Sequence, residues 1–195
     1  MTSKLKVNVI ADSGDNTIIS SNGSGTVTLG AAFPSTGKIG QVVQTVKTDT
    51  FSTGSTSFSA ITGLSVNITP TATSSKILIR TLISYGGDQN LYAFGKLLRG
   101  STEILIGDAG ESSQTRATFP FMISAGDPSA GVFKSFHSGT EFLDSPSSTN
   151  QITYSISCAT AASGRDLYIN RASNNTNAGY IGRFASTITA MEVLA

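Results

Sequence analysis

Residues 151–158 read QITYSISC, an alternation of polar and apolar side chains with a period of two. Residues 64–69, LSVNIT, repeat this pattern and are followed by Pro70. A period of two places the apolar side chains on one face of a β-strand, and the Ser, Thr, Asn and Gln on the other face indicate a sheet that meets water on one side. The single cysteine, Cys158, belongs to the apolar set, so we expect a buried thiol and no internal disulfide.

Similar short runs recur along the chain, and helical periodicity is almost absent. Gly and Pro punctuate the runs at close spacing, which is typical of antiparallel all-β folds. We therefore predict an antiparallel β-sandwich or jelly roll of about ten short strands. Besides the two stretches above, strands are expected at 39–47, 76–85, 91–98, 103–106, 115–123, 132–136, 141–143, 167–170 and 186–194.

The first part of the chain has a different pattern of apolar residues. Its apolar residues form three brief runs, separated by DSGDN at 12–16 and SNGSG at 21–25, which are both turn sequences. Three such strands are too thin to bury a core, so we expect residues 1–36 to order mainly against a partner and residues 37–195 to form the sandwich. The side chains expected to face that partner are Leu5, Val7, Val9, Ile18, Ile19, Val27 and Leu29.

The composition excludes several classes of function. Charged residues make up 13% of the 195 residues, about half the ordinary share, and the formal net charge is +1. Lys and Arg do not form runs, which disfavours a nucleic-acid partner. No stretch approaches the ~18 apolar residues that cross a bilayer, and the N-terminus lacks the apolar region of a secretion signal. We expect no membrane insertion.

No catalytic or metal-binding signature is assembled in the sequence. His137 is the only histidine, whereas zinc sites and serine- or cysteine-based catalysis need further partners. The acidic residues Asp12, Asp15, Asp108 and Glu111 lie in turns and do not have the ligand spacing of a calcium loop. Glycoside hydrolysis needs two positioned carboxylates, and no convincing pair is evident. We therefore expect a protein that is not an enzyme, with no cofactor and no resident metal.

Several tyrosines lie beside polar loop residues. Tyr92, Tyr168 and Tyr180 are each close in sequence to Asn side chains, a combination that stacks a sugar ring and hydrogen-bonds its hydroxyls. The alternative is that each ring packs on a sheet and only its hydroxyl meets water. The candidate glycan contacts are Asp88, Asn90, Tyr92, Asn174, Asn175 and Tyr180.

Five patterns occur in order along the chain, from residue 3 to residue 193. They are SKLKVN through NTIIS at 3–20, GQVVQ at 40–44, KLLRGST at 96–102, FLDSP at 142–146 and STITAMEV at 186–193. In this order they resemble virion proteins of tailed bacteriophages, especially the short fibre and tail-associated proteins of viruses of marine bacteria.

This resemblance implies a location in the virion, after assembly in the host cytoplasm. It implies that the opening segment is a modular virion attachment piece, and that the sandwich forms a homotrimer whose interface includes Ile188, Met191 and Val193. The expected function is that of a short tail fibre or tip protein, which docks on other virion proteins and contacts glycan on the host surface. Because no long shaft separates the two parts, a capsid or head decoration protein without receptor binding is the alternative.

Overall fold

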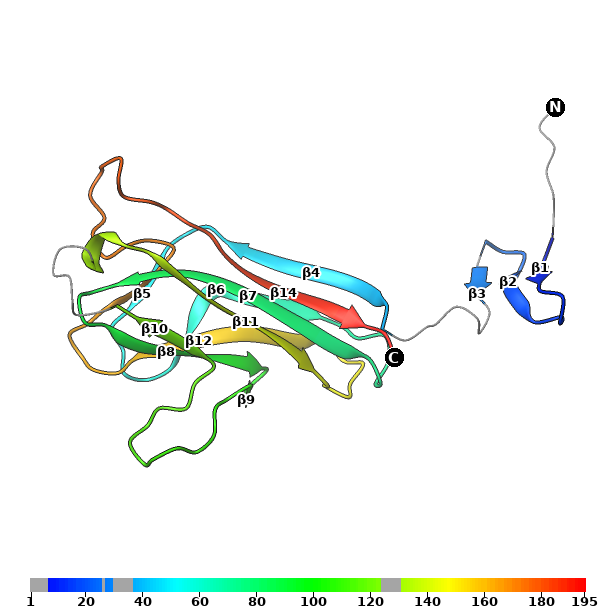
Figure 1. Ribbon diagram of the computed structural model, residues 1–195, viewed down its shortest axis with the longest axis horizontal. Coiled ribbons are helices and arrows are strands. Elements are labelled where there is room, and N and C mark those ends of the chain that lie inside the picture. Colours follow the sequence, from blue (N-terminus) through cyan, green and yellow to red (C-terminus); the bar gives the residue numbers. More distant parts are fainter. Residues whose placement is uncertain (1–6, 26, 30–36, 124–130) are drawn as a thin grey trace.

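The computed structural model of the protein describes residues 7–25, 27–29, 37–123 and 131–195 (Figure 1). In this part of the chain the regular elements are β-strands, apart from one 3-10 turn, η1 (Gly131–Phe133). The all-β class predicted from the sequence is confirmed. In chain order the strands are β1 (Val9–Ala11), β2 (Thr17–Ser21), β3 (Val27–Leu29), β4 (Ile39–Lys47), β5 (Phe51–Thr53), β6 (Ser59–Ile68), β7 (Lys76–Gly87), β8 (Tyr92–Arg99), β9 (Thr102–Ile104), β10 (Phe119–Met122), β11 (Phe136–Asp144), β12 (Ile152–Thr160), β13 (Leu167–Ile169) and β14 (Ser186–Val193).

From β4 onward the strands form two antiparallel sheets. In the first sheet β14 lies between β4 and β7, and β11 pairs with the other edge of β7. The short strands β13 and β5 extend this sheet from the end of β7. In the second sheet the order is β10, β8, β12 and β6, and β9 pairs with β8 beside β10.

This strand order is that of a jelly roll. When the eight main strands β4, β6, β7, β8, β10, β11, β12 and β14 are numbered one to eight, the two sheets read 1-8-3-6 and 2-7-4-5. Two such four-stranded sheets, packed face to face, define the double-sheet jelly roll. The predicted sandwich is therefore confirmed, and its connectivity is now specified.

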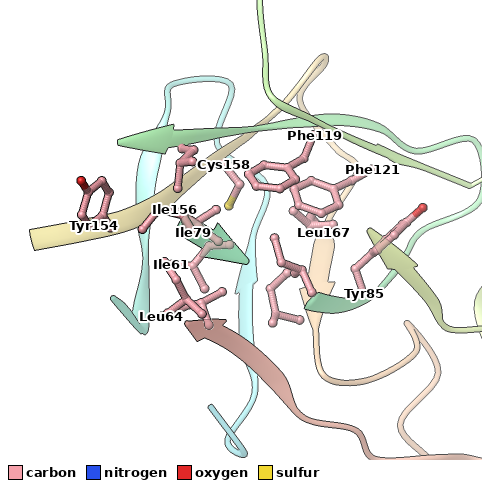
Figure 2. Packing of buried hydrophobic residues seen from close by; sticks show 14 of the residues in the cluster. Ile61, Leu64, Ile79, Tyr85, Phe119, Phe121, Tyr154, Ile156, Cys158 and Leu167 are labelled. Carbon is pink, nitrogen blue, oxygen red and sulfur yellow. The ribbon is translucent and has the colours of Figure 1, made fainter. Parts of the chain in front are cut away.

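The hydrophobic core fills the space between the two sheets (Figure 2). Ile79 of β7 and Ile188 of β14 are fully buried on the inner face of the first sheet. The second sheet contributes Phe119 and Phe121 of β10, whose rings stack with centroids 6.2 Å apart. Tyr85 packs edge-on against Phe121 at 5.0 Å, so an aromatic cluster joins the two sheets.

The alternation at 151–158 correctly predicts which side chains of this strand are buried. Along β12 the side chains of Tyr154, Ile156 and Cys158 are completely buried. Burial raises the pKa of the Cys158 thiol to about 12, so this cysteine is an inert core residue.

One predicted strand, at 132–136, is wrong. Residues 131–133 form η1, and the strand begins at Phe136 and runs without a break to Asp144. The sequence Ser138-Gly139 resembles a turn, but Gly139 lies inside β11 opposite Leu82. A Cβ at this position would collide with the Thr81 carbonyl oxygen, so glycine is present because two strands approach closely there.

The N-terminal strands form a small sheet of their own, in the order β1, β2 and β3. The turn between β1 and β2 is built on Asp12, whose carboxylate accepts hydrogen bonds from the N–H groups of Gly14 at 2.8 Å and Asn16 at 3.0 Å. This is the turn chemistry that DSGDN predicts. The domain boundary predicted within 33–37 falls mostly on residues 30–36, which lie outside the described residues, so the division at 36 stays a prediction.

Candidate interaction surfaces

The N-terminal sheet exposes its apolar side chains. All three residues of β1 are exposed, and Val27 of β3 is 60% exposed. Among the described residues, no strand of this sheet pairs with a strand of the jelly roll. The role of these residues as an anchor stays a prediction. Of its candidates, Val7, Val9 and Val27 are exposed and Ile18 and Ile19 are half-buried, whereas Leu5 and the side chain of Leu29 lie outside what the structure describes.

Most of the polar groups proposed to bind glycan make hydrogen bonds within the loops, and their role in glycan binding stays a prediction. The Asp88 carboxylate accepts hydrogen bonds from the Asp166 N–H at 2.8 Å and the Ser173 hydroxyl at 2.7 Å. The side chain of Asn174 accepts a hydrogen bond from the Thr176 N–H, and the side chain of Asn175 accepts one from Arg183. The Asp88 bond to Ser173 does bring the 88–91 loop and the 173–185 loop together. The side-chain oxygens of these residues are nevertheless already engaged.

The two exposed tyrosines remain available. Tyr92 is 56% exposed at the start of β8, and Tyr180 is 73% exposed, with its ring edge-on to Phe133 at 5.8 Å. Tyr168 is different, because the Arg171 guanidinium lies 3.8 Å from the centre of its ring and covers that face. Within the described part of the chain, no ring contact joins Tyr92 to Tyr180.

Asn90 lies in the turn that leads into Tyr92. Its backbone has φ of 62°, the left-handed conformation that Asn tolerates better than most residues. Its side-chain oxygen is buried without a hydrogen-bond partner. Asn90 therefore shapes the turn, and its side-chain oxygen is not available to a ligand.

A buried asparagine fixes the base of the 171–185 loop. The Asn170 amide donates to the carbonyl oxygens of Lys47 and Asp49, both at 2.8 Å, and its oxygen accepts from the Ser186 hydroxyl at 2.6 Å. Asn170 has φ of 65°, so the chain turns sharply after β13. These contacts give the loop that carries Tyr180 a firm support.

His137 contacts a serine in an arrangement that is structural. The Ser84 hydroxyl lies 3.0 Å from His137 Nδ1 and donates to the Ala185 carbonyl oxygen, also at 3.0 Å. Ser84 is completely buried, so a substrate has no access to its hydroxyl. The His137 ring packs edge-on to Phe184. This group holds β7, β11 and the start of β14 together.

Two polar networks lie at the end of the sandwich where β14 and β11 terminate. In the first, Glu192 is completely buried and accepts hydrogen bonds from the Thr71 N–H at 2.6 Å, the Thr71 hydroxyl at 2.7 Å and the Gln41 amide at 2.8 Å. Burial alone would raise the pKa of Glu192, but the hydrogen bonds from Gln41 and Thr71 outweigh it and lower the pKa to about 2.

The second network joins the two sheets. One guanidinium nitrogen of Arg99 on β8 lies 2.8 and 2.9 Å from the two carboxylate oxygens of Asp144 on β11. The Tyr154 hydroxyl of β12 donates to the same carboxylate at 2.7 Å. Burial, and then this hydrogen bond, raise the pKa of the Tyr154 phenol above its usual range.

Each network contains residues from two of the separated sequence patterns. Gln41 and Glu192 come from the patterns at 40–44 and 186–193, and Arg99 and Asp144 come from those at 96–102 and 142–146. Each pair of patterns therefore meets in space through a buried carboxylate. Neither network is predicted from the sequence, although Glu192 follows Ile188 and Ala190 on the inward positions of one alternating strand.

One of the three residues predicted at the oligomer interface is wrong. Ile188 is completely buried in the hydrophobic core of its own chain, so it cannot contact a second copy. Alternation along β14 places Ile188 and Ala190 inward, and Met191 and Val193 on the opposite, partly exposed face. Met191 and Val193 therefore remain candidates.

A shallow hollow of about 330 Å³ lies between β8 and the loop from β9 to β10. Phe94 and Pro120 line it together with Asp108 and Arg116, and the Arg116 Nε donates to the Gly107 carbonyl oxygen at 2.8 Å. Its size is at the lower limit for small-molecule sites. Within the described residues, no group of three or more His, Cys, Asp or Glu side chains is placed to hold a metal ion.

No protein-family model matches the chain, and no curated protein does. Solved structures that resemble it include one of the Gx strain of infectious bursal disease virus, at 15% identity and a TM-score of 0.41, over 88% of this chain and 40% of that one. A second, of T=1 particles derived from the same virus, has 17% identity and a TM-score of 0.40, over 99% of this chain and 44% of that one. The chain thus spans less than half the length of these structures. In the described residues no helix is long and apolar enough to cross a membrane.

The Glu192 network predicts a pH-dependent stability. The native pKa is depressed from 4.5 to about 2, so the ionised carboxylate stabilises the fold above pH 4.5, and this contribution is lost as the pH falls towards 2. We expect Glu192→Gln to lower the free energy of unfolding at pH 7 by at most about 3 kcal/mol. The difference from wild type should shrink towards pH 2.

Urea unfolding at a series of pH values measures this difference. Glu111→Gln, in the exposed loop between β9 and β10, is the matched control and should change the unfolding free energy by less than about 0.5 kcal/mol at any pH. If wild type and Glu192→Gln lose stability in parallel as the pH falls, the carboxylate does not have this role.

Proposed function

We propose that this chain is a structural protein of a bacteriophage virion, a homotrimeric short tail fibre or tip protein that docks by its N-terminal segment and is not an enzyme. The observation that carries the proposal is the two-part organisation. A small sheet with exposed apolar residues, among them Val9 and Val27, precedes a jelly roll with which it shares no described strand pairing. Apolar side chains that are not buried in the core of their own chain are suited to packing against a docking partner.

The jelly roll itself suits a virion component. Jelly rolls occur in viral capsid and lectin domains, which present loops from a rigid double sheet. The five sequence patterns that resemble phage virion proteins include β1 and most of β2 of the small sheet, and they supply Gln41, Arg99, Asp144 and Glu192 to the two networks. Buried carboxylates held by hydrogen-bond donors are consistent with a rigid module. Because they are buried, they do not supply an accessible catalytic group.

Decoration of the capsid or head is the second candidate. The observation that favours it is the short connection, since β3 ends at Leu29 and β4 begins at Ile39. The intervening residues 30–38 reach at most about 30 Å when fully extended. A jelly roll tethered so closely stays near the surface on which it docks, as a decoration protein does.

Removal of residues 1–36 tests the docking role. We expect the truncated chain to fold as a jelly roll, because its core draws on residues from Ile61 onward, and to be absent from purified particles. Val9→Asp and Val27→Asp in the full chain should have the same effect, because an unpaired charge opposes burial against a partner. Ser13→Asp, in the exposed turn, is the control that adds the same charge and should still be incorporated.

Incorporation is measured by the amount of the protein on purified virions, and its position by electron microscopy of labelled particles. Normal incorporation of the truncated chain would contradict the docking role. Labels along the capsid, and none at the tail, would favour decoration over the tail fibre.

The glycan contact proposed for the host surface now depends on the two exposed tyrosines. We expect Tyr92→Ala combined with Tyr180→Ala to reduce adsorption of otherwise intact particles to host cells by at least about 10-fold, since multivalent presentation amplifies each weak contact. Tyr168→Phe, whose ring is covered by Arg171, is the control and should adsorb normally. Unchanged adsorption of the double variant, with the protein present on the particles, would contradict receptor binding through these residues.

A further inference from the structure

The outer face of the second sheet has two halves, a polar one on β6 and β12 and one on β8 and β10 that exposes Tyr92 and Met122. On β6 and β12 the outward side chains are polar, namely Ser65, Asn67, Thr153 and Ser155, and the Thr153 hydroxyl donates to Asn67 at 2.7 Å. This is the pattern expected of a sheet face that meets water. The outer face of the other sheet, formed by β4, β14, β7 and β11, departs from it.

Apolar side chains cross this second face in register. Met191 of β14 lies opposite Val42 of β4 on one side and Leu78 of β7 on the other, and Leu78 lies opposite Leu143 of β11. Val42 is 57% exposed and Leu143 is 44% exposed. Four strands therefore contribute one continuous apolar row to the surface.

A second row lies on the same face and is separated from the first by one row of residues. Val46, Thr187 and Leu82 are neighbours on β4, β14 and β7, and Val46 and Leu82 are each about half exposed. A hollow of about 320 Å³, lined by Leu82, Thr187 and Met191 among others, lies between the two rows. Contiguous exposed apolar surface of this kind marks an interaction site.

The row between the two apolar rows is polar but internally paired. Arg80 Nε lies 2.8 Å from a Glu141 carboxylate oxygen, and the Gln44 amide donates to the Thr189 hydroxyl at 2.8 Å. The four residues occupy neighbouring positions on the four strands and carry no net charge. This middle row therefore adds no net charge that would oppose a second copy of the same face.

We propose that the outer face of β4, β14, β7 and β11 is the surface through which copies of this chain pack against one another. Four strands of eight to twelve residues, spaced about 4.8 Å apart with a rise of about 3.3 Å, present roughly 500 Å² in projection. This is more than half of the roughly 800 Å² per partner of a standard interface. The face is thus large enough to form the apolar centre of a stable contact between copies.

This inference deepens the proposed function, because it assigns a surface to the expected oligomer, but its test uses purified protein in solution. We expect Leu82→Glu to weaken association by at least about 100-fold, since it places an unpaired charge in an apolar contact. Leu82 is half exposed in the single chain, so this variant should still fold, as thermal unfolding will show. Ser65→Glu, on the polar outer face, is the matched control and should leave association unchanged.

Light scattering over a range of protein concentrations gives the association. If the wild-type protein is still monomeric at roughly 100 μM, its copies associate too weakly for a stable contact, and the proposal is overturned. An oligomer that survives Leu82→Glu would also overturn it. If the wild-type protein is a dimer or trimer and Leu82→Glu converts it to monomers, the proposed face is supported. Failure of the docking experiment on virions would not change that conclusion.

A second measurement locates the contact even if Leu82→Glu does not fold. Cys158 is buried and its pKa is raised, so a cysteine introduced at the surface is the only reactive thiol. A spin label on Thr189→Cys, at the centre of the face, should give distances between copies that are shorter than those from a label on Ser65→Cys. The reverse order of distances would place the contact on the polar face and overturn the proposal.

Discussion

The insertion of the last strand, β14, between β4 and β7 is the constraint on which the rest of the structure depends. β14 pairs along both edges, so the first sheet is not continuous until β14 is in place. Its inward side chains, Ile188 and Ala190, complete the hydrophobic core. Its outward side chains, Thr189 and Met191, form the middle of the face through which we propose that copies assemble. One strand thus connects folding within the chain to assembly between chains.

Buried carboxylates secure this strand and its neighbours at one end of the sandwich. Glu192 and Asp144 both lie opposite Ile77 of β7, one on each side. Glu192 is held by neutral donors and Asp144 by Arg99, so both carboxylates have hydrogen-bond donors from the protein. A buried carboxylate left without its donors costs several kcal/mol, so these contacts favour one register of the strands over its alternatives. The segment that we propose as the virion anchor precedes β4, whose first residues belong to this end.

The sequence predicts the parts of this structure that depend on local alternation. The pattern at 151–158 predicts β12 and the burial of Cys158, and DSGDN predicts the turn after β1. Alternation does not reveal which strands pair, so it could not show that Glu192 accepts hydrogen bonds from Thr71, 121 positions away. The error at Ile188 has a different cause. Ile188 and Met191 are three positions apart, so alternation already places them on opposite faces of β14, and the packed sheets show only which face is the inner one. β5, with the sequence FST, was missed because it has a single apolar residue, whereas the equally short β13, LYI, has three.

Methionine oxidation tests the assembly face most directly, because the native chain carries a probe on each sheet. Met191 lies in the apolar row of the proposed face, and Met122 is exposed on β10 of the other sheet. The account predicts that oxidation of Met191 is slow at high protein concentration and accelerates on dilution, as copies separate, whereas the rate at Met122 stays constant. Equal acceleration at both residues, or a rate at Met191 that does not depend on concentration in a protein that is oligomeric, would contradict it.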